Sequence, residues 1–272
     1  MATDNQPEIG KFAVILCGGR GSRMGTLTQA TPKPLVEVHG KPILWYILHA
    51  LHKYGFRTII LPLGYQGQMV EAYVREVCRT LGCRVLARDT GEDTSIAGRI
   101  KQIADLIPED EDFFLLNSDT IFDFDIAAMH DLHKKSNALV TLSSVEVTSA
   151  WGLITMDGDR LAGFERERKV RRLVSDDHAG QYGLVNSGLA WLNKKALDHV
   201  DLDRCGDFES ALYPLVIDLG RAAHFQIRGS WFAIDTPKDL HIINLEVEDR
   251  HGTGHSARAM RDKLLNGPTS EC

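Results

Sequence analysis

A glycine-rich segment with two arginines, residues 16–25 (LCGGRGSRMG), has the composition of a phosphate-binding loop. Glycines let backbone N–H groups approach a phosphate chain closely, and an arginine adds a fixed positive charge. The segment lacks the Gly-Lys-Ser/Thr that ends a P-loop, and Met24 stands where the dinucleotide-binding fingerprint has its third glycine. For the glycines alone two interpretations remain, an anion-binding loop or a tight turn without a ligand.

A lysine between two prolines, Lys33, follows this segment in the sequence TPKPL. The prolines restrict the backbone on both sides, which suits Lys33 to hold an ammonium group against a phosphate. Arg23 in the glycine-rich segment is a second cation for the same phosphate chain. The alternative interpretation is a solvated lysine and a surface arginine.

Asp119 follows the apolar run FFLLNS, which has the pattern of a buried strand. Strand ends are where sheet folds present ligand-binding groups, and a carboxylate supplies the hard oxygen ligands that Mg²⁺ prefers. Taken alone, Asp119 could instead cap a helix or lie in a loop.

The glycine-rich segment, Pro-Lys-Pro at 32–34 and Gly-Lys-Pro at 40–42 occur in an order and spacing that resemble the sugar-1-phosphate nucleotidyltransferase family. The resemblance extends from about residue 12 to residue 240. It implies a Rossmann-like nucleotide-binding fold, Mg²⁺ as cofactor, and the reaction of an NTP with a sugar 1-phosphate to give an NDP-sugar and pyrophosphate. Such a reaction brings two anions together, so catalysis depends on positioning and charge neutralisation.

The same resemblance assigns the site residues by position. The catalytic residues would be Arg23 and Lys33. The metal ligands would be Asp119, preceded by Ser118 where the family usually has glycine, and Asp235 after the run WFAI. Because 116 residues separate the two aspartates, only the fold can join them, and Asp235 taken alone could also cap a helix or lie in a loop. The nucleotide would contact Leu16, Gly18, Gly19, Gly21, Ser22, Arg23, Thr90, Gly98 and Asp119. The sugar phosphate would contact Gly152, Glu167, Arg168 and Asn186. The family has a Glu-Lys pair in this region, and Glu165-Arg166 is the other candidate for it here, with arginine replacing lysine in either case.

The choice of nucleotide rests on residues 89–99, DTGEDTSIAGR. Asp-Thr-Gly followed by Gly-Arg resembles the glucose-1-phosphate cytidylyltransferases, which implies CTP and glucose 1-phosphate or a relative. Guanylyl, uridylyl and thymidylyl transfer stay open, as does a cytidylyltransferase acting on phosphocholine or a phosphonate. A non-catalytic regulatory subunit that binds a nucleotide sugar is a hypothesis of another class. The retention of both cations and both aspartates argues against it.

Strand-like and helix-like segments alternate along the chain, which predicts an α/β fold with a doubly wound, mostly parallel mixed sheet. No linker divides the chain, so we predict one nucleotidyltransferase domain over residues 1–248 and a polar tail over 249–272 with a short helix at 257–265. The expected strands are 12–16, 57–63, 83–87, 113–116, 138–145, 184–192 and 222–227. The expected longer helices are 42–54, 66–81, 95–107, 126–135, 208–219 and 238–247.

The composition narrows the classes of protein further. The 272 residues are 43% hydrophobic and 25% charged, as in globular proteins, and the net charge of −6 argues against a nucleic-acid partner. No apolar run approaches the roughly 20 residues that cross a bilayer, so no membrane partner is expected. The polar start of the chain and five cysteines without a Cys-x-x-Cys pair indicate a cytoplasmic protein. Besides its NTP and sugar 1-phosphate, the expected partner is a second copy of the chain, in a homo-oligomer.

Overall fold

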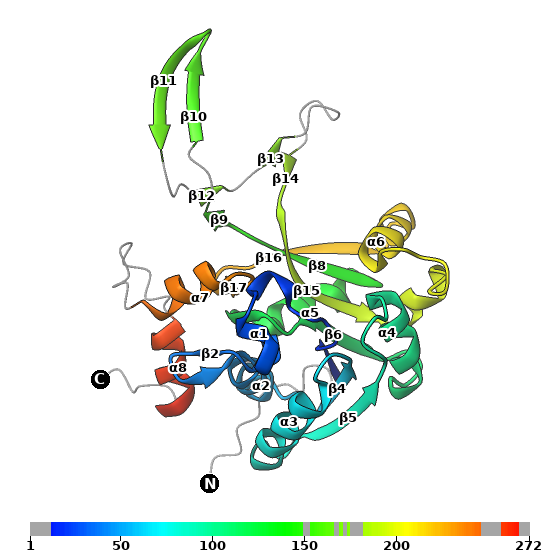
Figure 1. The fold of residues 1–272 in the computed structure, drawn as a ribbon. Helices are drawn as coiled ribbons and strands as arrows, with labels where there is room; N and C mark the ends of the chain where they lie inside the picture. The colour runs from blue at the N-terminus through cyan, green and yellow to red at the C-terminus, as the bar shows by residue number, and fades with distance from the viewer. Residues whose placement is uncertain are drawn as a thin grey trace, which may run out of the picture.

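A seven-stranded sheet forms the centre of the protein (Figure 1). The structure is a computed structural model, and it describes residues 12–148, 153–165, 169–170, 173–174, 182–245 and 257–266. The strand order is β16-β8-β15-β6-β1-β4-β5, and β15 alone runs antiparallel to its neighbours in this sheet. The predicted α/β fold class with a mostly parallel sheet is confirmed. The sheet strands are β1 (Phe12–Leu16), β4 (Thr58–Leu63), β5 (Arg84–Asp89), β6 (Asp112–Asn117), β8 (Val140–Val145), β15 (Val185–Asn193) and β16 (Ala222–Gln226).

Helices cover both faces of this sheet because successive residues of a buried strand point to opposite faces. In β1, Ala13 and Ile15 belong to a core shared with α2, α3 and α5, whereas Val14 belongs to a second core shared with α4 and α6. The helices are α1 (Leu27–Ala30), α2 (Ile43–Lys53), α3 (Gly67–Leu81), α4 (Ile96–Ile103), α5 (Ile126–Lys135), α6 (Phe208–Asp218), α7 (Pro237–Asn244) and α8 (Ala257–Asn266).

Short elements lie outside the central sheet. A hairpin of β10 (Leu153–Asp157) and β11 (Arg160–Glu165) projects away from the body (Figure 1). Its two-residue turn begins at Gly158, whose φ of 58° favours glycine. The remaining elements are β2 (Glu37–Val38), β3 (Lys41–Pro42), β7 (Thr120–Asp123), β9 (Val147–Thr148), β12 (Lys169–Val170), β13 (Leu173–Val174), β14 (Tyr182–Gly183), β17 (Ser230–Ala233) and the 3₁₀ helices Ser22–Met24, Lys33–Leu35, Ala104–Leu106 and Lys194–His199.

The antiparallel pair β7–β17 is the element that joins distant parts of the chain. Thr120 pairs with Ala233, and the backbone N–H of Ile234 donates to the carbonyl of Asp119 over 3.0 Å. Neither strand was expected from the sequence. The pairing fixes the segment before α7 beside the carboxyl end of β6.

The last described helix, α8, packs against the body rather than extending from it. Ala257 and Met260 are 2% and 5% exposed, and the Arg261 guanidinium donates to the carbonyl of His39 over 2.9 Å. Among the described residues, no helix has the length and apolar character needed to cross a membrane.

Candidate active site

The side-chain ammonium of Lys33 lies between two carboxylates at the carboxyl edge of the sheet. Its Nζ donates to Oδ2 of Asp119 over 2.7 Å and to Oδ1 of Asp235 over 2.8 Å. Lys33 is 8% exposed, so this is a largely desolvated cluster in which each charge has a stronger effect than in water. The fold therefore brings together three of the residues that the sequence singled out.

Lys33 is held by the local backbone that its neighbours impose. It begins the 3₁₀ helix Lys33–Leu35, preceded by Pro32 at φ −61°. Gly21 faces it from the glycine-rich segment with φ 62°, and a Cβ at Gly21 would lie 3.0 Å from the Lys33 Cβ. Gly21 thus allows both the left-handed turn and the close approach of the two segments.

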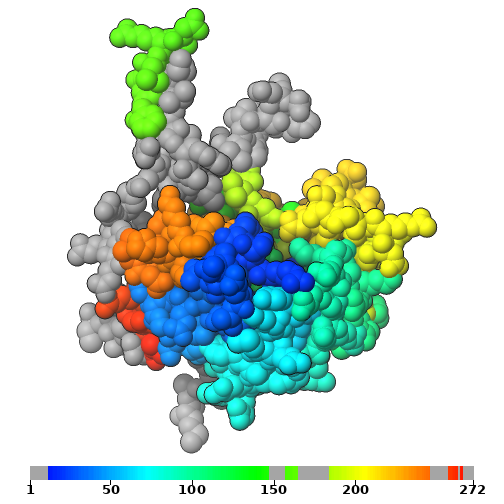
Figure 2. Space-filling model, in the orientation of Figure 1, coloured from blue at the N-terminus to red at the C-terminus, as the bar shows by residue number. Residues whose placement is uncertain are grey.

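Arg23 is the exposed cation of the cluster. Its Nη2 lies 3.0 Å from Oδ1 of Asp235, and 68% of its side chain is exposed. Figure 2 shows the blue N-terminal segment meeting the orange segment of β17 and α7 at the molecular surface. Two cations and two carboxylates therefore balance in charge, and Arg23 is the one most open to an incoming anion.

Different local contacts hold Asp119 and Asp235 in place. Asp119 follows β6, whose end is tied to β1 by a hydrogen bond from the Ser118 hydroxyl to the Leu16 carbonyl over 2.7 Å. Asp235 directly precedes α7, which begins with a capping box between Thr236 and Asp239. The Asp235 N–H also donates to the Asp239 carboxylate over 3.1 Å. Neither aspartate serves as the N-cap, which was the alternative role considered from sequence.

The donor set suits Mg²⁺, which proteins commonly hold through one or two carboxylates together with substrate phosphates. Asp119 and Asp235 converge on a single ammonium, so they are close enough to act on one cation. No group of three or more His, Cys, Asp or Glu side chains within the described ranges is arranged for a metal. A cation here would need further oxygen ligands from a substrate or water.

Most of the predicted nucleotide-binding residues lie on or next to two neighbouring loops, whereas Leu16 ends β1 and Asp119 lies in the cluster around Lys33. The first loop follows β1, where Gly19 and Ser22 are exposed and Gly18 is buried. The second follows β5 and leads into α4, whose first turn contains Gly98; in this loop Thr90 is 4% exposed and donates its hydroxyl to the Leu63 carbonyl over 2.6 Å. The Gly98 N–H donates to the hydroxyl of Ser95, the N-cap of α4. Both residues therefore use their polar groups to shape the loop.

Of the predicted sugar-phosphate contacts, Asn186 is described in full. It lies at the start of antiparallel β15, which places it at the same sheet edge as the carboxyl end of β6. Its Nδ2 donates to Glu209 over 3.2 Å, and its Oδ1 accepts from the Gly188 N–H. Gly152, Glu167 and Arg168 lie outside the described residues, as does Arg166. Arg99 was not among the predicted site residues, although its guanidinium donates to both nucleotide loops.

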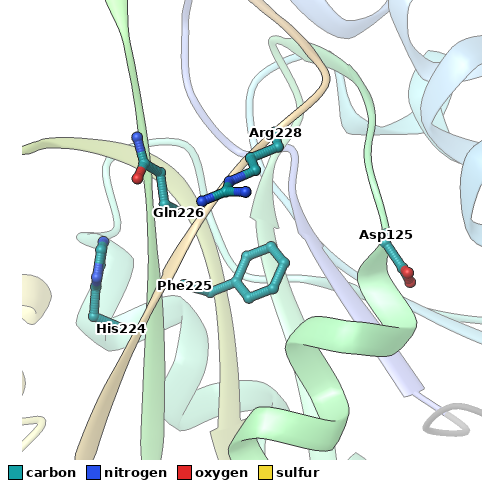
Figure 3. Close-up of a pocket in the computed structure, with 5 residues that line it drawn as sticks. All are labelled: Asp125, His224, Phe225, Gln226 and Arg228. Carbon is teal, nitrogen blue, oxygen red and sulfur yellow. The ribbon is translucent and has the colours of Figure 1, made fainter. Parts of the chain in front are cut away.

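A separate cavity of about 380 Å³ opens beside the edge strand β16 (Figure 3). Phe225 points toward the start of α5, where Asp125 is the N-cap, whereas His224 and Gln226 leave the strand on the other side. The lining, which also includes Arg228, contains none of the predicted site residues. The cluster around Lys33 is therefore the better candidate for the reaction.

Comparisons with known proteins identify relatives over most of the chain. A family model described as nucleotidyl transferase matches residues 12–250. The chain is 31% identical over 251 residues to a probable glucose-1-phosphate cytidylyltransferase of Bacillus subtilis (strain 168), covering 85% of this chain and 94% of the relative. It is 32% identical over 232 residues to a mannose-1-phosphate guanyltransferase beta-B of Xenopus laevis, covering 84% of this chain and 62% of that one.

Solved structures show the same fold. A putative glucose-1-phosphate thymidylyltransferase from Bacillus anthracis superposes with a TM-score of 0.63 at 16% identity, over 86% of this chain and 94% of the other. HddC from Yersinia pseudotuberculosis superposes with a TM-score of 0.60 at 23% identity, over 85% and 97%.

Proposed function

The chain belongs to the nucleotidyl transferase family, as a sugar-1-phosphate nucleotidyltransferase, and we propose that it uses CTP and glucose 1-phosphate to make CDP-glucose and pyrophosphate. The observation that carries the site assignment is the convergence of Lys33 and Arg23 on Asp119 and Asp235. The cytidylyl and glucosyl choices have further support from the loop after β5 and from the relatives.

The proposed chemistry is a displacement at the α-phosphorus of the nucleotide. An oxygen of the sugar phosphate forms the new bond to the α-phosphorus, and the bond to the oxygen bridging the α- and β-phosphorus breaks as pyrophosphate leaves. The nucleophile is already an anion, so no general base is required. The protein must instead hold two anions together and neutralise charge, which is the work of positioned cations.

Lys33 and Arg23, which both contact Oδ1 of Asp235, supply these cations. The Lys33 ammonium has three donor positions, of which two are used by the carboxylates, so it can donate another to a phosphate oxygen. The Arg23 guanidinium is exposed on the rim and can bind the leaving phosphates with two parallel hydrogen bonds. Asp119 and Asp235 would hold Mg²⁺, which when bound supplies further neutralisation of phosphate charge.

The preference for CTP is supported by the second loop. The segment Asp89-Thr-Gly91 begins at the last residue of β5, and Gly98-Arg99 lies in the first turn of α4, so both border the glycine-rich loop at the carboxyl edge. The similarity to the Bacillus subtilis protein favours the same substrates. GTP with mannose 1-phosphate is a second candidate, favoured by the similarity to the Xenopus laevis protein.

The test is a competition assay at equal concentrations of CTP, UTP, dTTP, GTP and ATP, with saturating sugar 1-phosphate and detection of each nucleotide sugar. The highest kcat/KM is expected for CTP with glucose 1-phosphate, because a base that leaves buried polar groups unpaired is rejected strongly. Preference for GTP and mannose 1-phosphate would replace the cytidylyl proposal by the second candidate. The Asp235→Asn variant is the negative control for nucleotide-sugar formation.

A further inference from the structure

We infer that Arg99 is a positioning residue that locks the two nucleotide loops together and thereby sets nucleotide affinity and base discrimination. The inference rests on the proposed function, in that these loops bind an NTP. It concerns a side chain that lies behind the loops and contacts no predicted catalytic group.

The guanidinium of Arg99 donates to both loops and to the strand between them. Its Nη2 donates to the Gly18 carbonyl over 3.0 Å and to the Glu92 carbonyl over 3.0 Å. Its Nη1 donates to the Leu63 carbonyl over 2.9 Å and to the Thr90 hydroxyl oxygen over 2.5 Å. These acceptors follow or end β1, β4 and β5, which are neighbours in the sheet. One side chain thus fixes the spacing of three adjacent strand ends.

Arg99 is only 4% exposed, and its four acceptors are three carbonyl oxygens and one hydroxyl oxygen. Burial of the guanidinium lowers the pKa of Arg99, and the carboxylates of Asp89 and Asp93 oppose this shift. A buried cation is costly unless its donors are used, and the planar fork of arginine meets four acceptors at once where a lysine ammonium cannot. The free-energy cost of burying this cation is offset by its four hydrogen bonds, which fix the positions of the acceptors.

Two glycines beside Arg99, Gly18 and Gly64, leave the space that its guanidinium occupies. A Cβ on Gly18 would lie 2.1 Å from the guanidinium carbon, and one on Gly64 would lie 2.7 Å from Nη1 and 2.5 Å from the Gly18 carbonyl oxygen. By contrast, a Cβ on Gly19 would meet nothing within 4 Å. The space at Gly18 is therefore occupied by Arg99, so this glycine serves the contact between the loops.

The nearby contacts make the loop after β5 dependent on this guanidinium. The Thr90 hydroxyl accepts from Arg99 while it donates to Leu63, and Gln102 donates to the Thr90 carbonyl over 3.3 Å. At the surface, the Arg20 guanidinium also joins the loops through Glu92 at 2.8 Å, with both side chains half exposed. An exposed pair of this kind contributes little, so the buried fork of Arg99 is the main connection.

The experiment measures nucleotide binding by calorimetry, in the absence of sugar 1-phosphate, for the wild type and for Arg99→Gln and Arg99→Lys. The probes are CTP, UTP and GTP with Mg²⁺. We expect at least a tenfold weaker Kd for the best wild-type nucleotide in Arg99→Gln, little rescue by Arg99→Lys, and a smaller ratio between the best and worst nucleotides. Steady-state assays should show a rise in the KM for the nucleotide that exceeds the fall in kcat.

Lys101→Met is the matched control, since Lys101 lies on the same helix and pairs with Asp203 on the surface. It should bind nucleotides like the wild type. Wild-type affinity and wild-type base preference in a folded Arg99→Gln variant would overturn the inference. A wild type that binds none of the nucleotides would instead overturn the proposed function, so the two failures are distinguishable.

A double-mutant cycle tests the contact between Gly18 and Arg99 by melting temperature, independently of nucleotide binding. Gly18→Ala should lower the melting temperature in the wild type more than in the Arg99→Gln background, where the clash with the guanidinium is gone. Gly19→Ala should change the melting temperature little in either background. Equal effects of Gly18→Ala in both backgrounds would contradict the contact. If Arg99→Gln does not fold, nucleotide Kd is measured for Arg99→Lys and Gly18→Ala instead. A wild-type nucleotide affinity in either variant would overturn the inference.

Discussion

The ammonium of Lys33 and the carboxylate of Asp119 lie 2.7 Å apart although 86 positions separate them in the chain. The same ammonium binds Asp235, so a lysine stands between the two carboxylates that we expect to hold a divalent cation. A divalent cation held there would therefore compete with Lys33 for the same oxygens, and its binding would leave more donors of the ammonium available to the phosphates.

Substitution of Lys33 by methionine should separate these two roles. Transfer activity should fall by about 10²–10³, the usual effect of losing one donor aimed at developing charge. The affinity for Mn²⁺ without nucleotide should rise, because two carboxylates lose their ammonium partner. Calorimetric titration with Mn²⁺ measures this directly, and Lys53→Met, which removes an ion pair with Asp123, is the control. Unchanged Mn²⁺ affinity would contradict the competition.

Neutralising either carboxylate should abolish the metal-dependent reaction. Asp119→Asn and Asp235→Asn each replace a negative oxygen ligand at nearly constant volume, so the fold should be retained while Mg²⁺-dependent pyrophosphate release is lost. Circular dichroism checks the fold and a pyrophosphate assay checks the activity. Full activity of the wild type after EDTA treatment would show that no metal is required.

The buried Asp112, at the opposite end of β6, should control stability in acid. Burial alone would raise its pKa, but hydrogen bonds with His130, His133, Lys134 and Asn193 outweigh burial and hold the pKa of Asp112 well below its usual range. A carboxyl group with a depressed pKa contributes stability above its unfolded-state pKa of about 4 and loses that contribution as the pH falls further.

Asp112→Asn should therefore lower the free energy of unfolding by about 1–3 kcal/mol at pH 7, the range for hydrogen bonds to charged groups. The gap between wild type and variant should narrow as the pH falls below about 4. Urea unfolding at pH 7, 5, 4 and 3 measures the trend. A gap that stays constant over this series would exclude Asp112 as its source.

Cys83 should react with alkylating agents at lower pH than an ordinary thiol. A hydrogen bond with Cys78, aided by His52 with its Nδ1 at 3.9 Å, lowers the pKa of Cys83 against the opposing effect of burial. Mass spectrometry after brief iodoacetamide treatment should give a modification midpoint below that of an ordinary thiol, and Cys78→Ala should raise it. Cys17, whose pKa burial raises to about 12, should stay unmodified. An unchanged midpoint in Cys78→Ala would show that Cys78 does not stabilise the thiolate.

The central sheet could be predicted because each of its strands carries its own signal. Residues 12–16 and 58–63, for example, are short apolar runs that are buried on both faces. The hairpin β10–β11 was missed although the Gly158-Asp159 dipeptide is a turn signal that could have revealed it. The pair β7–β17 joins four-residue strands from distant segments, and such a register is decided by tertiary packing rather than by local pattern.

The candidate site was partly predictable for the same reason. Lys33 and the glycine-rich segment are local motifs, whereas their distance to Asp119 and Asp235 follows from the fold alone. The sequence predicted that Gly18 lets backbone approach a phosphate, but the space beside its Cα holds the Arg99 side chain. A glycine signals a close approach without telling which group approaches.

The order of elements along the chain has a consequence for biosynthesis. All seven strands of the central sheet lie within residues 12–226, and the glycine-rich loop is near their beginning, whereas Asp235 follows β17. Proteins are synthesised from the N-terminus, so a nascent chain can complete its sheet and its first nucleotide loop before the second carboxylate leaves the ribosome. The capacity to bind a nucleotide would then arise before the capacity to catalyse its reaction. Pairing of β17 with β7 would be the last step, because it brings Asp235 to the site.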